Sequence, residues 1–361
     1  MVVPAIPTSQ KVAAITTFSD PPILSVLTDY PVPDPATLLP SQALIRITHS
    51  GVCHSDLHIA AGHWPAAPPP LVGGHEGVGI VVAFGPGAEL TDGSIKIGAR
   101  VGVKWLIDAC GRCELCRRGS DPLCPFRKLS GLTVDGTFCE YMVAWIDHLI
   151  PIPDGVSSQD AAPILCAGLT VYSALKRANL AVGDWVVVPG AGGGLGHLAI
   201  QYALAIGLRV VAIDSGAEKK SLCLALGADQ WIDFKETSSV PDAVISICDG
   251  LGAHAALVTS PSTASYYDAL AYLRPMGTLM ALGAPIAFTF NVSLDLLVVK
   301  GLHIVGSILG NRQDAHEALD LVARGKVKSH QIPCKLEDIN TVFREMETGT
   351  SVGRAVIQME H

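Results

Sequence analysis

The stretch VVVPGAGGGLGHLAIQ, residues 186–201, decides the fold class of this chain. A short apolar run rich in β-branched residues leads into glycines, and apolar residues at helical spacing follow, which predicts a strand, a tight turn and a helix. Further strands are expected at RVVAID (209–214), AVISIC (243–248), GTLMALG (277–283) and LHIVGS (302–307), with helix-like segments between them. Strands that alternate with helices predict an α/β domain with a doubly wound parallel sheet.

The glycines of the first turn indicate a pyrophosphate site. Glycine lets the backbone approach a phosphate closely, and the N-terminus of the following helix offers free N–H groups. The strict G-x-G-x-x-G pattern is not met, because Ala191 takes the first position in the register that ends at Gly196. The alternative register is Gly190, Gly193 and Gly196. Glycine-rich turns also occur for packing alone, which is the competing interpretation.

Asp214 favours the dinucleotide interpretation. It ends the next strand, at the interval of about 20 residues where a carboxylate accepts hydrogen bonds from the ribose hydroxyls of NAD. The same carboxylate repels the 2′-phosphate of NADP. Lys219 could also reach the ribose, although an exposed helix lysine is usually only solvated. We therefore predict a Rossmann domain that binds NAD(H).

A second stretch, CGRCELCRRGSDPLC at 110–124, places four cysteines in one short loop: Cys110, Cys113, Cys116 and Cys124. This spacing is typical of a structural zinc site, in which four thiolates complete a tetrahedron and leave no position for substrate. A redox-active thiol group and coincidence are the alternatives. No secretory leader is evident, so we expect a cytoplasmic protein, in which clustered cysteines bind metal rather than form disulfides.

Composition and charge exclude other classes of protein. A net charge of −8 argues against nucleic acid or an anionic membrane as partner, and there is no apolar run long enough to span a membrane. Short β-like runs at QALIRITHSG (42–51), GVGIVVAFG (77–85) and EYMVAWIDHLIPIP (140–153) predict a mostly-β first domain. We expect domains at 1–160 and 161–300, with 301–361 returning to the first domain.

Three scattered residues have the side chains of an open zinc site. Cys53, His75 and Cys166 supply two thiolates and one imidazole, which leaves a fourth position for water or substrate. Their separations in the sequence carry no metal-spacing signal. On spacing alone, each is more often a buried cysteine or a core histidine than a metal ligand.

The chain resembles the zinc-dependent medium-chain alcohol dehydrogenases, especially the yeast-type branch. The similarity is carried in family order by CHSDLH (53–58), LVGGHEGVG (71–79), the four-cysteine loop, PILCAGLTVY (163–172), GAGGGLG (190–196) and VGRAVI (352–357). It implies a GroES-like catalytic domain beside the Rossmann domain, two zinc ions per chain and NAD(H). It also implies hydride transfer between a zinc-bound alcohol or aldehyde and nicotinamide, and a homo-oligomer, which is usually a tetramer in this branch.

The resemblance assigns roles around the catalytic zinc. It makes Cys53, His75 and Cys166 the ligands, Glu76 an acid that can approach the metal, and Asp56 the carboxylate that orients the histidine. Ser55 matches the hydroxyl that bonds the substrate oxygen. His58 matches the outer base of a proton relay.

The resemblance also assigns the cofactor contacts. His54 and Arg354 match residues that contact the pyrophosphate, and Thr170 matches a threonine that packs against the nicotinamide. The remaining cofactor-binding residues follow from the glycine turn and the next strand: Gly190, Gly193, Gly194, Leu195, Gly196, Asp214 and Lys219.

One departure concerns the substrate pocket. Trp64 falls at a pocket tryptophan of yeast-type enzymes, whereas Ala60 falls where ethanol-active relatives carry a second one. Loss of that ring would free on the order of 100 Å³, which predicts a pocket wider than in ethanol-type enzymes unless Ile59 or Trp64 fills the gap. The alternatives are a specialised reductase of one bulky metabolite aldehyde in a biosynthetic pathway and, more distantly, a zinc-ribbon binding protein without catalysis.

Overall fold

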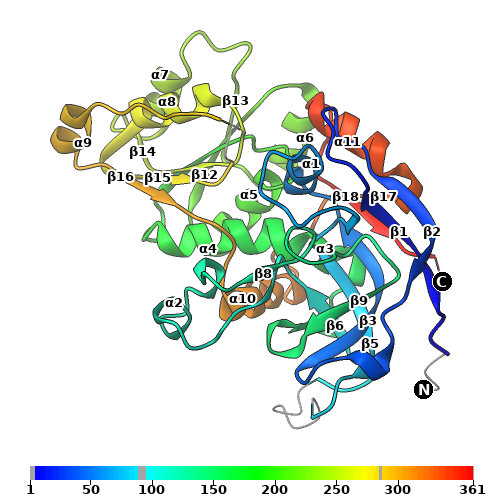
Figure 1. Cartoon of the computed structure of the whole chain (residues 1–361). Coiled ribbons are helices and arrows are strands. Elements are labelled where there is room, and N and C mark those ends of the chain that lie inside the picture. Colours follow the sequence, from blue (N-terminus) through cyan, green and yellow to red (C-terminus); the bar gives the residue numbers. More distant parts are fainter. Residues whose placement is uncertain (1–4, 88–94, 284–286, 361) are drawn as a thin grey trace. The chain divides into compact units, whose positions relative to one another are not determined.

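The computed structural model describes residues 5–87, 95–283 and 287–360, and Figure 1 traces the chain from blue to red. These residues form two compact units. The first contains the chain up to Cys166, then Asn311–Ala323, and then the chain from Gln331 onward. The second contains Ala167–Gly310 and Arg324–His330.

The second unit contains a parallel sheet with the strand order β13-β12-β11-β14-β15-β16. The strands are β11 (Trp185–Pro189), β12 (Arg209–Asp214), β13 (Gln230–Asp233), β14 (Ala253–Val258), β15 (Leu273–Ala281) and β16 (His303–Gly306). The order reverses at β11, which is buried along its whole length, and this reversal is the switch point at which doubly wound sheets bind nucleotides. The predicted Rossmann-type sheet is confirmed.

Helices connect these strands. They are α4 (Leu169–Arg177), α5 (Gly196–Ala205), α6 (Ala217–Ala225), α7 (Val240–Ile247), α8 (Thr263–Tyr272) and α9 (Leu294–Lys300). The core packs β-branched strand residues such as Val187, Val211 and Val258 against Tyr266 and Leu270 of α8.

One expected strand is wrong, because AVISIC lies in helix α7 and its end. The Ser239 side chain caps this helix by accepting from the backbone N–H of Asp242, and a proline stands in the first turn. The buried side chains Val240 and Val244 are one helical turn apart. The strand in this part of the sheet is the following AHAALV of β14, whose alanines give only a weak strand signal.

The first unit is built mainly from antiparallel strands. Its larger sheet has the order β10-β6-β5-β3-β18-β17, with β9 also paired to β3. The strands are β3 (Gln42–Gly51), β5 (Gly77–Phe84), β6 (Arg100–Val103), β9 (Tyr141–Trp145), β10 (Ile150–Pro151), β17 (Gln331–Cys334) and β18 (Arg354–Gln358). Two smaller sheets contain β2 (Ser25–Pro31), β1 (Ser9–Ile15) and β4 (Leu71–Val72), and β7 (Leu106–Asp108) with β8 (Lys128–Leu129). The predicted mostly-β catalytic domain is confirmed.

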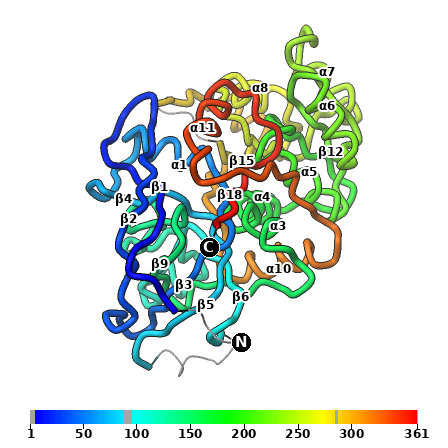
Figure 2. Tube along the Cα trace, turned by 90° about the vertical axis from the view of Figure 1, so that its right-hand side faces the viewer, coloured from blue at the N-terminus to red at the C-terminus, as the bar shows by residue number. Residues whose placement is uncertain are grey.

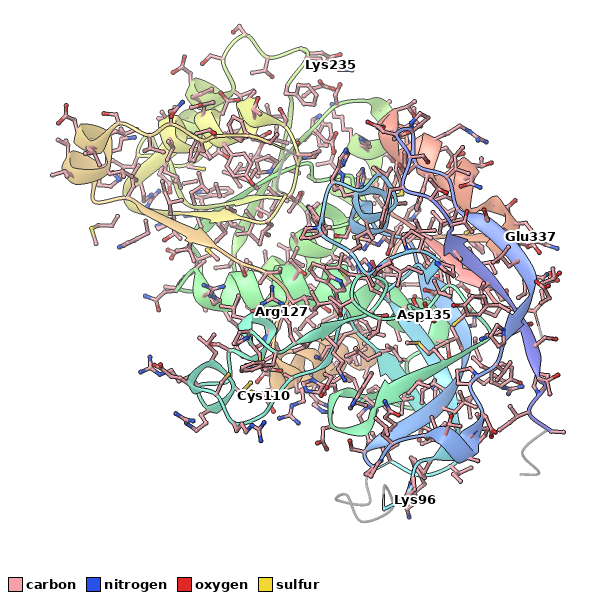
Figure 3. The ribbon with its side chains drawn as sticks, viewed as in Figure 1. Lys96, Cys110, Arg127, Asp135, Lys235 and Glu337 are labelled. Carbon is pink, nitrogen blue, oxygen red and sulfur yellow. The ribbon has the colours of Figure 1, made fainter. Side chains whose placement is uncertain are left out.

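The C-terminal segment completes this first unit. Strand β18 pairs antiparallel with β3, as the red end of the chain shows where it rejoins the early strands in Figure 2. Glu337, labelled in Figure 3, forms an ion pair with Lys11 of β1 at 2.7 Å. The C-terminal segment therefore contacts both the larger sheet and strand β1 of the first unit.

Helices of the first unit position the candidate site. They are α1 (His54–Ala60), α2 (Glu114–Arg117), α3 (Ser158–Pro163), α10 (Arg312–Ala323) and α11 (Ile339–Glu347). Helix α3 runs into a π-helical turn, Ile164–Gly168, a distortion that is frequent at functional sites. Among the residues described, no helix has the length and apolar character needed to cross a membrane.

Candidate active site

Four buried side chains of the first unit converge on one point: Cys53, His75, Glu76 and Cys166. One ligand atom from each lies within 4.8 Å of the others. His75 Nε2 is 3.3 Å from Cys166 Sγ, close to the roughly 3.5 Å between a nitrogen and a sulfur on one tetrahedral zinc. The donor set therefore fits zinc, and the fold unites ligands that their sequence spacing could not connect.

Asp56 fixes the orientation of two ligands. Its Oδ1 lies 2.7 Å from Nδ1 of His75, and its Oδ2 accepts from the backbone N–H of Cys53 at 2.8 Å, where α1 begins. With Nδ1 donating to Asp56, the lone pair of Nε2 is left for the metal. Burial lowers the pKa of His75, but the charge and hydrogen bond of Asp56 together with Cys53 outweigh burial and leave that pKa well above its usual value.

A buried ion pair lies beside these ligands. Arg354 donates from Nε to Glu76 Oε2 at 3.3 Å and from Nη2 to Oε1, and both side chains are almost completely buried. Burial raises the pKa of Glu76 to about 7, against the opposing effect of Arg354. The pyrophosphate contact assigned to Arg354 stays a prediction.

Gly51 makes room for Glu76. A Cβ atom at Gly51 would lie 2.3 Å from Glu76 Oε2, so only glycine fits at the end of β3 without moving the acid. Nothing in the local sequence marks this requirement, because Glu76 lies 25 residues away, directly before β5.

The two thiols of the cluster are not equivalent. A hydrogen bond with Cys166 lowers the pKa of Cys53 well below its usual value, and the Arg354 charge lowers it further against the effect of burial. Thiolate is the form of cysteine that binds zinc, so this environment favours metal binding at Cys53.

Helix α1 carries the residues predicted for proton transfer. Ser55 Oγ lies 3.8 Å from Cys53 Sγ. His58 is half-buried, and burial lowers its pKa, as do the neighbouring rings of His54 and His63. His54 itself is exposed on the same helix.

Two tryptophans lie next to the ligand cluster. The ring of Trp64 stacks on that of Trp105, with centroids 5.8 Å apart, and Trp105 lies 5.7 Å from the ring of His75. Trp64 was expected near the substrate. Trp105 was not expected there, since it follows strand β6 and adjoins the site only in the folded chain.

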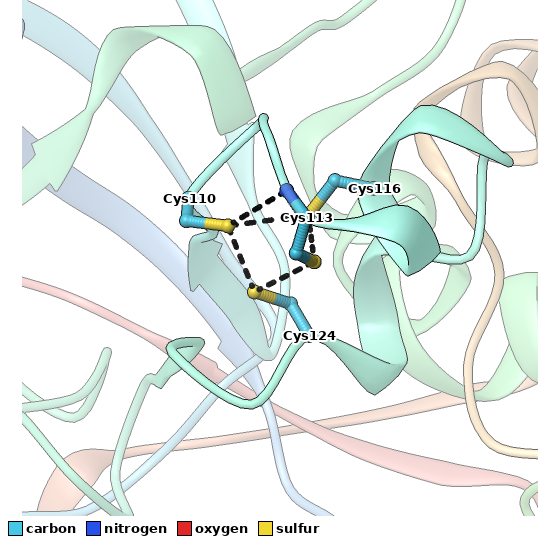
Figure 4. Close-up of side chains that lie close together, drawn as sticks. All are labelled: Cys110, Cys113, Cys116 and Cys124. Carbon is cyan, nitrogen blue, oxygen red and sulfur yellow. Dashed lines mark hydrogen bonds between the residues drawn. The ribbon is translucent and has the colours of Figure 1, made fainter.

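The four-cysteine loop forms a second candidate zinc site, shown in Figure 4. Adjacent Sγ atoms are 3.5 to 3.9 Å apart, close to the edge of about 3.8 Å in a tetrahedral Zn–S₄ site. Backbone N–H groups of Arg112 and Cys113 lower the pKa of Cys110 to about 6, which favours its thiolate. Cys110, labelled in Figure 3, lies on an outlying loop that also carries α2. With four protein ligands, this site is closed to substrate.

In the second unit, the glycine turn, Asp214 and Lys219 lie together at the carboxyl end of β11. Gly190 has a left-handed backbone with φ +81°, and a Cβ at Gly196 would lie 2.1 Å from the Gly190 carbonyl oxygen. Asp214 Oδ2 accepts from the backbone N–H of Gly192 at 3.0 Å, and its Oδ1 is 3.2 Å from Lys219 Nζ. The acid therefore holds the glycine turn in place.

The turn keeps a surface suited to phosphate. Gly193, Gly194 and Leu195 remain partly exposed directly before α5, where the helix N-terminus favours an anion. Thr170 lies in α4 and is 9% exposed. These features fit a dinucleotide, while the individual ribose and nicotinamide contacts stay predictions.

Comparisons with known proteins agree with this geometry. Residues 39–154 match the alcohol dehydrogenase GroES-like domain, and residues 194–324 match the zinc-binding dehydrogenase domain. The chain is 47% identical over 331 residues to alcohol dehydrogenase 1 of Emericella nidulans, covering 91% of this chain and 93% of that protein. It is 42% identical to an alcohol dehydrogenase of Schizosaccharomyces pombe, covering 98% and 99% of the two chains.

Among solved structures, an acetophenone reductase of Geotrichum candidum in complex with NAD superposes with a TM-score of 0.85. The two sequences are 30% identical, and the match covers 98% of each chain.

Proposed function

The chain belongs to the zinc-dependent medium-chain alcohol dehydrogenases, and from this premise we propose that it interconverts primary alcohols and aldehydes larger than ethanol and acetaldehyde. It is an oxidoreductase that acts on alcohols and uses NAD(H) and two zinc ions per chain. The observation that carries the proposal is the cluster of Cys53, His75 and Cys166, which leaves one position of a tetrahedral ion for substrate.

When bound, zinc polarises the oxygen of the substrate and NAD(H) exchanges a hydride with its carbon. Cys53, His75 and Cys166 would hold the ion, and Asp56 fixes the ring of His75. The buried Glu76–Arg354 pair keeps a compensated charge beside the ligands, since an isolated charge at full burial would be costly. The stacked rings of Trp64 and Trp105 exclude water from this side of the cluster.

Oxidation of an alcohol also requires a proton to leave the site. We propose that Ser55 forms a hydrogen bond with the substrate hydroxyl and that His58 receives the proton through the nicotinamide ribose. The lowered pKa of His58 keeps its ring neutral near pH 7, so that it can act as a base.

The size of residue 60 supports the preference for larger substrates. Ala60 has only a methyl group where ethanol-active relatives carry an indole, and Trp64 keeps the other wall. Ala60 is completely buried, however, so the wider pocket requires that its neighbours have not closed over the gap. The Geotrichum relative, which by name acts on an aryl ketone, supports including ring compounds among the candidates.

The test is NADH oxidation with a series of aldehydes, from acetaldehyde to cinnamaldehyde and larger rings, with zinc counted on the same sample. We expect two zinc ions per chain and a higher kcat/KM for the ring aldehydes than for acetaldehyde. Ala60→Trp should reverse that order by filling the pocket. A parent enzyme that prefers acetaldehyde would refute the wide pocket, and one zinc ion with no turnover would favour the zinc-ribbon alternative. Activity confined to a single bulky aldehyde would identify the specialised reductase.

We further propose a homo-oligomer, as expected of the yeast-type branch, in which it is a tetramer. Strand β16 is at the edge of its sheet, and α9 exposes Leu294, Val298 and Val299 by 76, 79 and 83%. An open strand edge beside exposed apolar side chains suits pairing with a second copy. Light scattering should give a lower mass for Val299→Asp, whereas Val182→Asp, equally exposed elsewhere at 83%, should leave the mass unchanged.

The cytoplasm is the compartment that we propose. All ten cysteines, each within the described ranges, are free thiols, and six of them belong to the two candidate zinc sites. A reducing compartment keeps such thiols available for metal. Cell fractionation tests this, and recovery of the protein from an oxidising compartment would contradict it.

A further inference from the structure

A second histidine lies directly outside the proposed proton base. Nδ1 of His63 is 3.4 Å from Nδ1 of His58, and their ring centroids are 5.5 Å apart. When one of these nitrogens carries a proton and the other does not, the first donates a hydrogen bond to the second, which provides a route for proton transfer. Trp64, whose ring centroid is 5.9 Å from that of His58, limits the approach of water from another side.

The backbone builds this pair. Helix α1 ends at Ala60, and Gly62 turns the chain with a left-handed φ of +75°. The backbone N–H of His63 then donates to the carbonyl of His58 at 3.0 Å. The contact is therefore fixed by the end of the helix and does not depend on the chance position of two long side chains.

Exposure to solvent increases from one ring to the next. His58 is half-buried and His63 is exposed. The titratable groups that face His58 are His54 on the same helix, His63, and the Cys53 thiol at the start of the helix. Of the two imidazoles that flank His58, only His63 is joined to it by a hydrogen bond among the described residues.

We propose that His63 is the outer proton carrier of this enzyme, receiving from His58 the proton of the alcohol and delivering it to solvent. The proposal rests on the proposed role of His58. In oxidation, His58 gains a proton at Nε2 and releases its Nδ1 proton to Nδ1 of His63. His63, which thereby becomes an imidazolium, gives its Nε2 proton to water or buffer base.

One proton crosses from the site to solvent, and no electron moves in this step. Both rings exchange protons with solvent to recover their starting tautomers, and aldehyde reduction runs the same path in reverse. His63 acts only through His58, so its role is to position and relay a proton and not to contact the substrate.

The electrostatics give this arrangement a measurable signature. While His63 carries a positive charge, that charge disfavours protonation of His58. His63 therefore releases its proton to solvent before His58 accepts the next one. Removing His63 should move the pH at which alcohol oxidation reaches half its maximum upward, because His58 would then hold its proton more tightly.

The experiment measures proton release with an indicator dye after the holoenzyme with NAD is mixed with alcohol, in weakly buffered solution. His63→Gln keeps a hydrogen-bonding side chain but cannot carry the proton. We expect its proton release to be about three- to tenfold slower, and we expect added imidazole to restore its rate of alcohol oxidation, followed by NADH absorbance. His316→Gln, at an exposed position on α10, is the matched control and should behave as the parent.

A double-mutant cycle separates the two proposals. If His58→Gln slows proton release and His63→Gln adds nothing in that background, both histidines act on one path. Normal release in His63→Gln beside slow release in His58→Gln would overturn the role of His63 and leave the relay intact. Normal release in His58→Gln would refute the relay itself. A slow His63→Gln enzyme that imidazole does not rescue would indicate a structural effect and count against proton transfer.

Discussion

At the scale of single residues, the carboxylate of Asp56 bonds to two of the proposed zinc ligands. One oxygen bonds the ring of His75 and the other bonds the backbone of Cys53. The same acid caps the N-terminus of α1, so the helix, the thiol and the imidazole are positioned by one side chain. Even a substitution of Asp56 that changes few atoms should therefore weaken metal binding strongly.

We predict that Asp56→Asn weakens zinc binding at the catalytic site about 10- to 100-fold and leaves the four-cysteine site filled. The amide keeps the shape of the cap but loses the negative charge that accepts the Nδ1 proton of His75 and makes Nε2 a stronger metal ligand. Competition with a chelator, followed by counting the retained zinc, measures this. Asp184→Asn removes a comparable carboxylate 3.0 Å from His254 in the other unit and serves as the control. Equal zinc retention in Asp56→Asn and this control would contradict the prediction.

The residues of the site differ in how far sequence alone could identify them. Cys53, His75 and Cys166 were predicted only through the family resemblance, since ligands from three separate elements leave no periodic trace. Gly51 and Trp105 were not predicted at all, because their importance depends on what approaches them in three dimensions. Such contacts have no local sequence signal.

At the scale of elements, local chemistry decided which predictions succeeded. The strand-turn-helix unit around Gly190 and the four-cysteine loop are each encoded within a few residues, and both are found as predicted. Helix α7 shows the limit, because six apolar or small residues fit a strand as well as a helix until the cap at Ser239 is considered. The alanine-rich β14 forms because it is buried between two other strands.

The four-cysteine loop, residues 110–124, has few stabilising contacts apart from its candidate metal site. Helix α2 has four residues and none of them is fully buried, and in the rest of the loop only Asp121, Pro122 and Cys124 are buried. Asn311 bonds the carbonyl of Gly119 at 3.1 Å, which attaches the loop to the start of α10. Metal coordination must therefore supply most of the stability of the loop.

We predict that Cys110→Ser lowers the melting temperature and opens the loop to proteolysis, while folded enzyme that retains catalytic zinc keeps its kcat. The reason is that four thiolates hold the fold of the loop and do not contact substrate. Thermal unfolding, limited proteolysis and steady-state kinetics on one preparation measure the three quantities. Cys334→Ser, which removes a thiol outside either cluster, is the control. Unchanged stability in Cys110→Ser would show that the loop does not depend on its metal.

At the scale of the whole molecule, the first unit also buries polar groups that belong to neither set of candidate metal ligands. Lys104 is completely buried and donates to the carbonyl of Leu106 at 3.0 Å; burial lowers its pKa to about 8. Asp121 Oδ2 and His148 Nδ1 are buried without a hydrogen-bond partner among the described residues. Burying such groups costs free energy, and the cost of each depends on its protonation state.

His148 should therefore make the stability of the protein depend on pH. Burial lowers its pKa to about 3, and the charges of Lys104 and Arg312 lower it as well. The unfolded chain has a histidine pKa of about 6.5, so below that pH the unfolded state binds a proton that the folded state does not. The contribution of neutral His148 to the free energy of unfolding is thus fully present above about pH 6.5. It falls as the pH decreases and is about 2 kcal/mol smaller at pH 5.

We predict that His148→Gln is less stable than the parent at pH 7.5, where neutral histidine packs well, but loses about 2 kcal/mol less on acidification to pH 5. Urea unfolding at the two pH values measures the free energy of unfolding of parent and variant, taken from the first unfolding transition of each. Loss of zinc at low pH affects both proteins equally and so cancels in that difference. His316→Gln, exposed on α10, should lose as much unfolding free energy as the parent between the two pH values. If His148→Gln also lost as much unfolding free energy as the parent, the His148 ring would be protonated, or reached by water, in the folded protein.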